Sequence, residues 1–363
     1  MRLDDLPTPA LVLDRRALQR NVARMQARAK QLGVRLRPHM KTAKSIDVAR
    51  MILGESGDGI TVSTLKEARY FLDHGIHDIT YGVGLVPSKL DEAAHLMQGG
   101  ADLKLITDDV EAAHAASQRG QELGVTFKVM IEIDSGGGRA GLFVDDPALI
   151  ELGRVLAAGP GTTLHGVLTH AGHSYACPST NDIVAVAEQE RATMVDAAGR
   201  LRKAGLACPV VSVGSTPTAM FARNLDGVTE MRPGVFCFMD LFQSQLGVCA
   251  PEDIAVSVLA SVVGHKSDGS KAMIDAGALA LSQDQSLEGF GRVLGKPWKV
   301  AKVSQEHGHV YPADPGAKVD PVVGQRVRVL PNHVCMMAAM HEQYHVVDGG
   351  DEVVAVWDRC NGW

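Results

Sequence analysis

A lysine directly after the first β-type segment of the sequence is the first candidate for covalent chemistry. Lys41 stands in the segment Arg37-Pro-His-Met-Lys-Thr-Ala-Lys44. A lysine amine forms an imine with an aldehyde once desolvation or a neighbouring positive charge lowers its pKa. His39 and Lys44 are candidates for that influence. A single lysine at a strand end is more often a solvated surface group, so other residues must support a catalytic role.

Histidine, tyrosine and arginine side chains follow two later segments of the same kind. The run Leu168-Thr-His-Ala-Gly-His-Ser-Tyr175 offers His170, His173 and Tyr175, and the segment before it leads to Arg139. Arg139 is interpreted as a cation for a cofactor oxygen, although a surface salt bridge is the ordinary role of such a residue. The group of side chains is richer than packing requires.

The glycine-rich run around Arg139 does not indicate a nucleotide site. Gly136-Gly-Gly-Arg-Ala-Gly141 has the spacing Gly-x-Gly-x-x-Gly, but the next helical pattern begins only near Asp146. No Gly-Lys-Ser/Thr sequence follows it. The sequence therefore argues against dinucleotide or ATP binding.

Two turns are candidates for holding a phosphate group. The segment Pro209–Thr218 places Gly214, Ser215 and Thr216 before a helix whose first turn contains proline. Backbone N–H groups in such a turn suit an anion. The following β-type segment ends in Glu230-Met-Arg-Pro-Gly-Val235. Each turn alone would be unremarkable, but the loops after strands seven and eight of a barrel commonly bind phosphate.

A histidine and a cysteine near the C-terminus form a candidate metal pair. In Leu330-Pro-Asn-His-Val-Cys335, the spacing of two residues predicts that His333 and Cys335 lie on one side of an extended chain. Imidazole and thiolate suit zinc, and two protein ligands leave positions open for water or substrate. A His-x-Cys pair by itself is more often coincidence.

The residues in the first two thirds of the chain are positioned by a repeat of β-type and helical segments. Arg15–Leu32 is predicted as a helix with Asp14 as its N-cap and an end at Gly33. Eight strands are the number that closes a (β/α)8 TIM-type barrel, although an open doubly wound sheet is the alternative. The predicted strands are Arg35–Pro38, Gly59–Ser63, Asp78–Gly84, Asp102–Thr107, Phe127–Asp134, Leu164–Gly172, Pro209–Thr216 and Val228–Phe236.

The pattern changes to long β-type runs after about residue 246, which predicts a C-terminal, mostly-β domain. We expect the α/β barrel over residues 14–245 and the β-domain over 246–363, with residues 1–13 packed against the latter. The predicted strands of this domain are Val256–His265, Lys271–Leu281, Trp298–Val303, Arg326–Leu330, Tyr344–Val347 and Val353–Trp357.

Composition excludes several classes of function. The chain has 363 residues and a formal net charge of −6, which provides no general attraction for nucleic acid. No apolar stretch is long enough to cross a membrane, and the first residues do not resemble a signal peptide, so we expect a cytoplasmic protein. The six cysteines are scattered singly, and only Cys335 is interpreted as functional.

Several of these motifs together resemble the D-serine dehydratase and D-threonine aldolase family of fold-type III pyridoxal-phosphate (PLP) enzymes, which share the alanine-racemase-like barrel. The resemblance covers almost the whole chain. The segments that carry it are Pro38-His-Met-Lys-Thr42, Thr61-Val-Ser-Thr-Leu-Lys-Glu-Ala68, Thr169-His-Ala-Gly172 with Tyr175, Ser212-Val-Gly-Ser-Thr-Pro-Thr218, Gln305-Glu-His-Gly308 and Pro331-Asn-His-Val-Cys335.

The resemblance implies a role for each candidate residue. Lys41 would hold PLP, and His333 and Cys335 would hold a divalent metal, zinc before manganese or magnesium. The residues implied to contact the cofactor are His39, Arg139, His170 and Tyr175, and those implied to surround its phosphate are Gly214, Ser215, Thr216, Gly234 and Val235.

The implied reaction is loss of water from a small D-3-hydroxy amino acid, of the D-serine or D-threo-3-hydroxyaspartate type, to give a 2-oxo acid and ammonia. The freed Lys41 amine would remove the Cα proton, and the metal would help the hydroxyl leave. D-threonine aldolases tend to carry an acidic residue at the position of Cys335, which favours a dehydratase. The family also implies a homodimer.

Three other functions compete with the dehydratase interpretation. An aldolase would break the Cα–Cβ bond and release glycine and an aldehyde. An amino-acid racemase would share the barrel and Lys41 but needs a second base, for which His333-x-Cys335 gives no reason. A non-catalytic PLP carrier would lack a domain such as residues 246–363.

Overall fold

The structure is a computed structural model that describes residues 1–54, 57–287 and 289–363. It divides into two compact units, and each unit is built from several separate segments of the chain. The barrel unit consists of Met25–Lys41, Ile52–Gly234 and Gly362–Trp363, and the β unit consists of Met1–Arg24, Thr42–Met51 and Val235–Asn361. The prediction assigned each domain one continuous range, 14–245 and 246–363, and so it did not include these separate segments. The reason is that the βα repeat of the sequence continues through segments that fold with the β unit.

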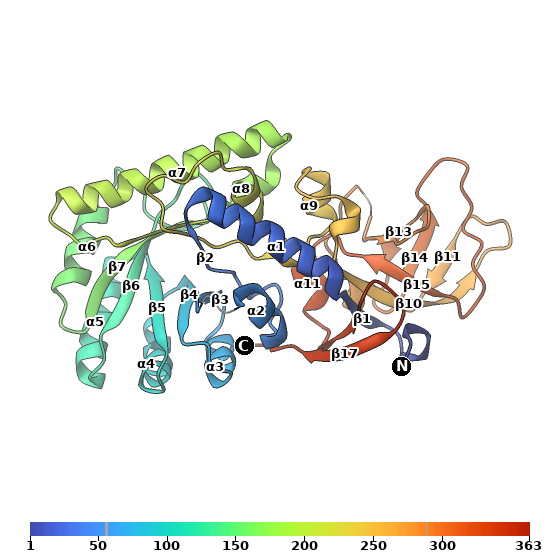
Figure 1. Ribbon diagram of the computed structural model, residues 1–363, viewed down its shortest axis with the longest axis horizontal. Helices are drawn as coiled ribbons and strands as arrows, with labels where there is room; N and C mark the ends of the chain where they lie inside the picture. The colour runs from blue at the N-terminus through green and yellow to red at the C-terminus, as the bar shows by residue number, and fades with distance from the viewer. Residues whose placement is uncertain (55–56, 288) are drawn as a thin grey trace. The chain divides into compact units, whose positions relative to one another are not determined.

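Eight parallel strands form the core of the barrel unit, and their order is β2-β9-β8-β7-β6-β5-β4-β3. Their bounds are β2 Arg35–Leu36, β3 Ile60–Val62, β4 Asp78–Gly84, β5 Asp102–Thr107, β6 Phe127–Glu132, β7 Thr162–Leu168, β8 Val210–Val213 and β9 Glu230–Met231. Figure 1 shows β4 to β7 side by side, with helices along them.

The two ends of this strand order join directly after β2. His39 forms a parallel bridge with Thr61 of β3. The backbone N–H of Met40 donates to the carbonyl of Thr61 at 2.7 Å, and the N–H of Thr61 donates to the carbonyl of Pro38 at 2.9 Å. The strands therefore close into a barrel, so the predicted (β/α)8 class is confirmed and the open doubly wound sheet is excluded.

Helices connect consecutive strands, as the repeat in the sequence predicts. Helix α1 spans Arg15–Leu32 as predicted. The Asp14 carboxylate accepts the backbone N–H of Arg16 at 2.9 Å, and the helix ends at Gly33, whose φ is +68°. The other helices up to β9 are α2 Ile46–Leu53, α3 Leu65–Asp73, α4 Leu90–Gln98, α5 Val110–Leu123, α6 Ala148–Ala158, α7 Thr180–Lys203 and α8 Thr216–Phe221.

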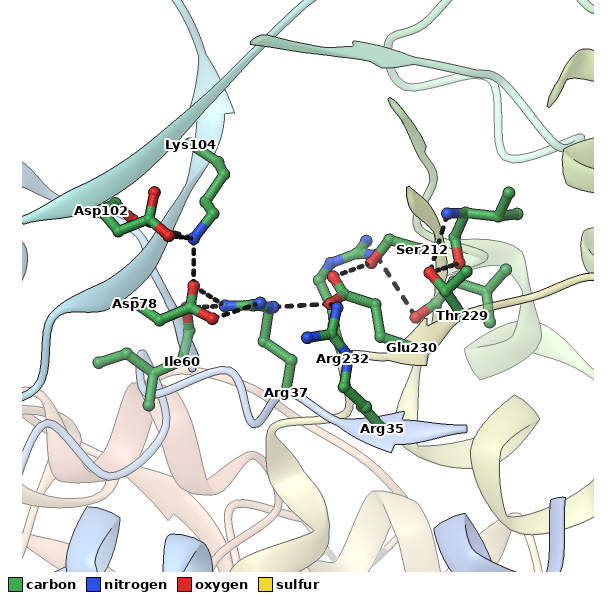
Figure 2. A network of polar contacts seen from close by, with 12 residues as sticks. Arg35, Arg37, Ile60, Asp78, Asp102, Lys104, Ser212, Thr229, Glu230 and Arg232 are labelled. Atoms are coloured by element: carbon green, nitrogen blue, oxygen red, sulfur yellow. Dashed lines mark hydrogen bonds and ion pairs between the residues drawn. The ribbon is translucent and has the colours of Figure 1, made fainter. Parts of the chain in front are cut away.

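A network of charged side chains connects several strands of the barrel (Figure 2). Nε of Arg37 lies 2.9 Å from a carboxylate oxygen of Glu230, the first residue of β9. The same guanidinium donates to Asp78, the first residue of β4, at 2.7 Å. Lys104 of β5 also donates to Asp78. The network thus links the residue after β2 with β4, β5 and β9.

The β unit contains a nine-stranded sheet with the order β11-β14-β13-β12-β15-β10-β1-β16-β17. An additional pairing of β11 with β10 closes the strands from β11 round to β10 into a ring. The bounds are β1 Ala10–Asp14, β10 Val256–His265, β11 Ala272–Ile274, β12 Arg292–Val293, β13 Trp298–Val303, β14 Gly308–Pro312, β15 Arg326–Leu330, β16 Gln343–Val347 and β17 Val353–Asp358.

The opening strand of the chain belongs to this sheet. β1 pairs antiparallel with β10 and parallel with β16, for example through Leu13 opposite Val256 and Val346. The sequence had placed residues 1–13 with these strands. The helices that follow β9 are α9 Leu241–Gln245, α10 Ala278–Leu281 and α11 Val334–Ala338. The short 3₁₀ helices among the described residues are η1 Leu3–Asp5, η2 Pro87–Lys89, η3 Gly172–Ala176, η4 Val235–Cys237 and η5 Pro251–Asp253.

One predicted strand of the β unit is wrong in part. Lys271–Leu281 is β-type in sequence, but β11 ends at Ile274 and α10 follows it. The N–H of Ala278 donates to the carbonyl of Ser304 at 2.8 Å, so this turn is fixed by a distant segment rather than by local sequence. Among the helices of the described residues, none has the length and apolar composition needed to cross a membrane.

Candidate active site

A cavity of about 270 Å³ opens at the carboxyl ends of the barrel strands. Five of the predicted cofactor residues line it: Lys41, His39, Arg139, His170 and Gly214. They follow four different strands, β2, β6, β7 and β8, which explains why residues so far apart in sequence meet. Among the other lining residues are four polar or charged ones that were not predicted from the sequence: Thr61, Asp108, Glu132 and Arg232.

His39 lies beside Lys41 but does not supply the positive charge expected of it. The backbone N–H of Lys41 points at Nδ1 of His39 at a distance of 3.4 Å. Desolvation lowers the pKa of His39 well below its usual value, and the positive charges of Lys41 and Arg232 lower it further. His39 is therefore a neutral imidazole at physiological pH. Arg232 is the cation of the cavity that sequence analysis missed.

His170 presents a defined nitrogen to the cavity. Its Nδ1 lies 3.0 Å from the carbonyl oxygen of Gly214. A carbonyl can only accept, so Nδ1 carries the proton and Nε2 keeps its lone pair. Desolvation, followed by the charge of Lys41, lowers the pKa of His170 to about 3. The ring of Tyr175, which is 37% exposed, lies with its centroid 6.2 Å from that of His170.

Gly214 is required by the backbone of the turn after β8. Its φ is +134°, and a Cβ atom at this position would lie 2.6 Å from the backbone nitrogen of Arg232. The next residue, Ser215, is the N-cap of α8: its hydroxyl accepts the N–H of Thr218 at 3.2 Å. The Ser215 hydroxyl also lies 2.8 Å from that of Ser174. Gly214 therefore faces the cavity, while Ser215 is engaged in capping the helix.

The remaining predicted phosphate residues lie in or beside the two strand-end turns. Thr216 is the first residue of α8 and is fully buried. Gly234 is the last barrel-unit residue of its segment, and Val235 is the first residue of the β unit that follows it. Val235 is buried and begins the 3₁₀ helix η4.

Arg232 is held in place by a chain of side chains (Figure 2). Its guanidinium donates to the hydroxyl of Ser212 at 2.5 Å. That hydroxyl donates to the carboxylate of Glu230 at 2.7 Å, and Glu230 is paired with Arg37. Desolvation lowers the pKa of Arg232 to about 10, although the charge of Glu230 opposes this effect. Arg232 therefore stays positively charged at physiological pH.

Two carboxylates accompany Arg139 at the cavity. The guanidinium of Arg139 lies 3.5 Å from a carboxylate oxygen of Glu132, which is buried, whereas the side chain of Arg139 is 63% exposed. Desolvation raises the pKa of Glu132, and the negative charge of Asp108 raises it further against the effect of Arg139. Asp108 accepts the N–H of Gly141 at 2.8 Å and so fixes the end of the glycine-rich loop.

The predicted metal pair lies in the β unit, at the beginning of α11. His333 is the N-cap residue of this helix, and Cys335 lies within it, so the predicted extended chain is wrong. The helix begins here because the carboxylate of Asp240 accepts the N–H of Val334 at 3.1 Å, a contact across 94 residues of sequence. Nδ1 of His333 lies 2.7 Å from a carboxylate oxygen of Asp284.

The surroundings of this pair fit a cation. Desolvation alone would lower the pKa of His333, but its hydrogen bond to Cys335 and the charges of Cys335 and Asp240 raise the pKa to about 9. The Cys335 sulfur lies 3.2 Å from the hydroxyl of Thr42. In the part of the chain that the structure describes, no group of three or more His, Cys, Asp or Glu side chains forms a metal site. An imidazole and a thiol thus make a two-ligand donor set of the kind that suits zinc.

Comparisons with known proteins agree with the two-unit architecture. A family model described as the N-terminal domain of alanine racemase matches residues 13–241, and one described as a putative serine dehydratase domain matches 255–347. The D-threo-3-hydroxyaspartate dehydratase of Delftia sp. strain HT23 is 48% identical over 99% of this chain and 98% of its own. The 3-hydroxy-D-aspartate aldolase of Paracoccus denitrificans is 31% identical over 97% of this chain and 91% of its own.

Solved structures support the same relationship. The Delftia dehydratase superposes with a TM-score of 0.96 at 47% identity, covering 100% of both chains. A variant of a D-threo-3-hydroxyaspartate dehydratase, solved in a metal-free form, has a TM-score of 0.96 at 46% identity and covers 100% of both chains. Alanine racemase of Clostridium difficile has a TM-score of 0.69 at 15% identity, covering 97% of this chain and 98% of its own, which shows a shared fold alone. The chain belongs to the D-serine dehydratase and D-threonine aldolase family of PLP-dependent lyases, which have the alanine-racemase-like fold.

Proposed function

We propose that this protein removes water from a small D-3-hydroxy amino acid, of the D-threo-3-hydroxyaspartate or D-serine type, to give a 2-oxo acid and ammonia. The observation that carries the proposal is the presence of Lys41 in a cavity lined by cations, carboxylates and neutral imidazoles, together with the thiol–imidazole pair Cys335 and His333. This combination occurs in a chain that matches a dehydratase along its full length.

The charges that line the cavity suit PLP. Lys41, Arg139 and Arg232 line it and suit the anionic oxygens of a phosphate or carboxylate. The absence of a side chain at Gly214 leaves its backbone open to close approach. PLP supplies an electron sink for the charge left at Cα, and a divalent metal, zinc before manganese or magnesium, supplies Lewis-acid assistance to loss of the 3-hydroxyl.

Lys41 would hold the cofactor and then move the Cα proton. A free lysine amine can act as the base that removes the Cα proton. His39 and His170 do not carry a positive charge, because desolvation lowers the pKa of both rings. Arg232, held by Ser212 and Glu230, would keep one fixed positive charge in the cavity. Lys41 is thus the cavity residue best suited to accept the proton.

His333 and Cys335 would hold the metal that acts on the 3-hydroxyl. Thr42 directly follows Lys41 in the chain, and its hydroxyl contacts the Cys335 sulfur at 3.2 Å. Lys41 is thus one residue away in sequence from a residue that contacts Cys335, which supports the participation of Lys41 and Cys335 in one reaction. We expect water and substrate to occupy the metal positions that these two residues leave open.

Retro-aldol cleavage is the second candidate reaction, since the Paracoccus aldolase is 31% identical over nearly the whole chain. Purified enzyme should be incubated separately with D-serine, D-threonine and D-threo-3-hydroxyaspartate, with PLP and zinc, manganese or magnesium. Formation of a 2-oxo acid and ammonia in equal amounts supports the dehydratase. Glycine and an aldehyde in equal amounts would replace it with the aldolase, and racemised amino acid alone would contradict both.

A further inference from the structure

We propose that Asp284 is a positioning residue that holds the imidazole of His333 through Nδ1, so that Nε2 is the nitrogen that binds the metal. The inference rests on the proposed function, in which His333 is a metal ligand, and assigns a role to a residue outside the His-x-Cys motif. Asp284 lies 49 residues before His333 in the sequence. Nothing in its local sequence distinguishes it from the other acidic residues of the β unit.

The hydrogen bond between the two side chains determines which nitrogen faces the metal. Oδ2 of Asp284 lies 2.7 Å from Nδ1 of His333. An ionised carboxylate only accepts hydrogen bonds, so Nδ1 carries the proton. Nε2 is then the nitrogen with a free lone pair once the ring is neutral. Histidines that bind metals generally donate their second N–H to a carboxylate or carbonyl in this manner, which orients the ring and raises the basicity of the ligand.

The segment that carries Asp284 is attached to the residue next to His333. The side-chain amide of Asn332 donates to the backbone carbonyl of Asp284 at 2.9 Å and to that of Gly289 at 2.5 Å. The amide oxygen of Asn332 accepts the hydroxyl of Ser286 at 2.8 Å. Asn332 is 1% exposed, so these bonds are shielded from water. The contact of Asp284 with His333 is therefore built into the fold rather than made by a mobile surface side chain.

A second carboxylate near His333 has a different role. The two oxygens of Asp240 accept the backbone N–H groups of Gln243 at 2.9 Å and Val334 at 3.1 Å. Asp240 thus caps the beginnings of α9 and α11 and fixes the backbone between His333 and Cys335. Its side chain is buried, whereas that of Asp284 is 37% exposed. Replacement of Asp284 leaves no buried cavity, so its effect on metal binding can be separated from its effect on folding.

Zinc affinity of the PLP-loaded enzyme tests the inference directly. Wild type, Asp284→Asn and Asp284→Ala are stripped of metal and titrated with zinc against a chromophoric chelator. Because loss of an outer-shell partner typically costs roughly 10–100-fold in metal affinity, we expect that fall for Asp284→Ala and a smaller one for Asp284→Asn. The melting temperature of the metal-free enzyme and the absorbance of bound PLP should not change. Asp320→Ala, an exposed residue of the same unit, is the matched control.

A second pair of variants shows whether Asp284 acts through His333. In the His333→Ala background, Asp284→Ala should cause no further loss of zinc affinity, because its partner is gone. Unchanged zinc affinity in Asp284→Ala would overturn the inference while leaving the metal site intact. An equal loss with and without His333 would also overturn it. If the wild-type enzyme bound none of zinc, manganese or magnesium, the metal part of the proposed function would fail together with the inference.

Discussion

At the scale of single residues, the environment of each nitrogen in the cavity decides which of them can carry a proton. His170 is bound through Nδ1 to Gly214, and the pKa of its ring is lowered to about 3. Arg232 stays charged because Ser212 and Glu230 support its guanidinium. Lys41 is left as the amine that the proposed chemistry requires. These properties depend on burial and on distant partners rather than on residue type.

The residue that holds PLP is tested by Lys41→Ala. The variant should lose the visible absorption of the lysine-linked cofactor and its turnover should fall to background, because the nucleophilic amine is removed. Absorbance and borohydride reduction followed by peptide mapping measure this. If Lys41→Ala kept both a borohydride-trapped cofactor and normal turnover, another lysine would be the attachment site, with Lys44 examined first.

The turn after β8 is tested by Gly214→Ala. A φ of +134° and a Cβ position 2.6 Å from the Arg232 backbone nitrogen make any side chain strained there. We expect the free energy of unfolding to fall by about 1–3 kcal/mol and PLP to bind more weakly. Gly199→Ala in α7 is the control, since nothing lies within 4 Å of its Cβ position. Equal unfolding free energies and PLP affinities for Gly214→Ala and wild type would show that the turn tolerates a side chain.

At the scale of secondary-structure elements, local patterns predicted the strands with clear boundaries. β4, β5, β10, β13, β15 and α1 have the limits expected from the sequence. The errors occur where partners are distant. Asp240 begins α11 at the metal pair, and the carbonyl of Ser304 fixes the start of α10. No sequence window of ordinary length contains both members of such a pair.

In the candidate site, too, some residues could be recognised from local sequence and others could not. Lys41, His170, Gly214 and Arg139 follow strand segments and could be selected by position and chemistry together. Arg232, Asp108 and Glu132 also follow or end strands, but they became recognisable only when the cavity placed them beside Lys41. Position at a strand end is the signal that could have identified them. Asp284 offers no such signal, because it lies in a loop of the β unit.

The charged network around Asp78 predicts a dependence of stability on pH. Although burial acts in the opposite direction, Arg37 and Lys104 lower the pKa of Asp78 from 3.8 to about 2. Because the folded-state pKa lies below the unfolded value, the stabilisation is present above pH ~4 and is lost as the pH falls towards ~2. Asp78→Asn should therefore lower the free energy of unfolding by about 1–2 kcal/mol at pH 7.

Denaturant unfolding of Asp78→Asn and wild type at several pH values measures this effect. The difference between them should shrink below pH ~4 and nearly vanish at pH ~2, if the folded state persists there. Asp145→Asn, an exposed aspartate of the same unit, should have little effect at any pH. A constant difference between Asp78→Asn and wild type across this range would show that the carboxylate charge is not what stabilises the network.

At the scale of the whole molecule, the two compact units carry different parts of the proposed chemistry. The barrel unit contains Lys41 and its cavity, and the β unit contains His333 and Cys335. The chain passes from one unit to the other between Lys41 and Thr42, and Thr42 contacts Cys335. The placement of these residues in two units is consistent with the two family models, each of which matches one part of the chain.

The family resemblance implies that the active enzyme is a homodimer. Sedimentation velocity at the concentration used for assays should show a species of twice the 38.6 kDa chain mass. Turnover per chain should fall on dilution if the active site needs both copies, because dissociation would then remove part of it. A fully active species with the mass of one chain would contradict the requirement for a dimer.

The central claim is that Lys41 and the metal pair act on different bonds of one substrate. The most direct measurement follows exchange of the Cα proton with solvent deuterium and formation of 2-oxo acid in the same sample. After chelation, or in His333→Ala or Cys335→Ala, PLP should stay on Lys41 and deuterium should accumulate at Cα without matching 2-oxo acid. Restored zinc should recover product formation in the wild type. If exchange and elimination instead declined equally while the fold and PLP were retained, the metal would only position the substrate and the claim would be contradicted.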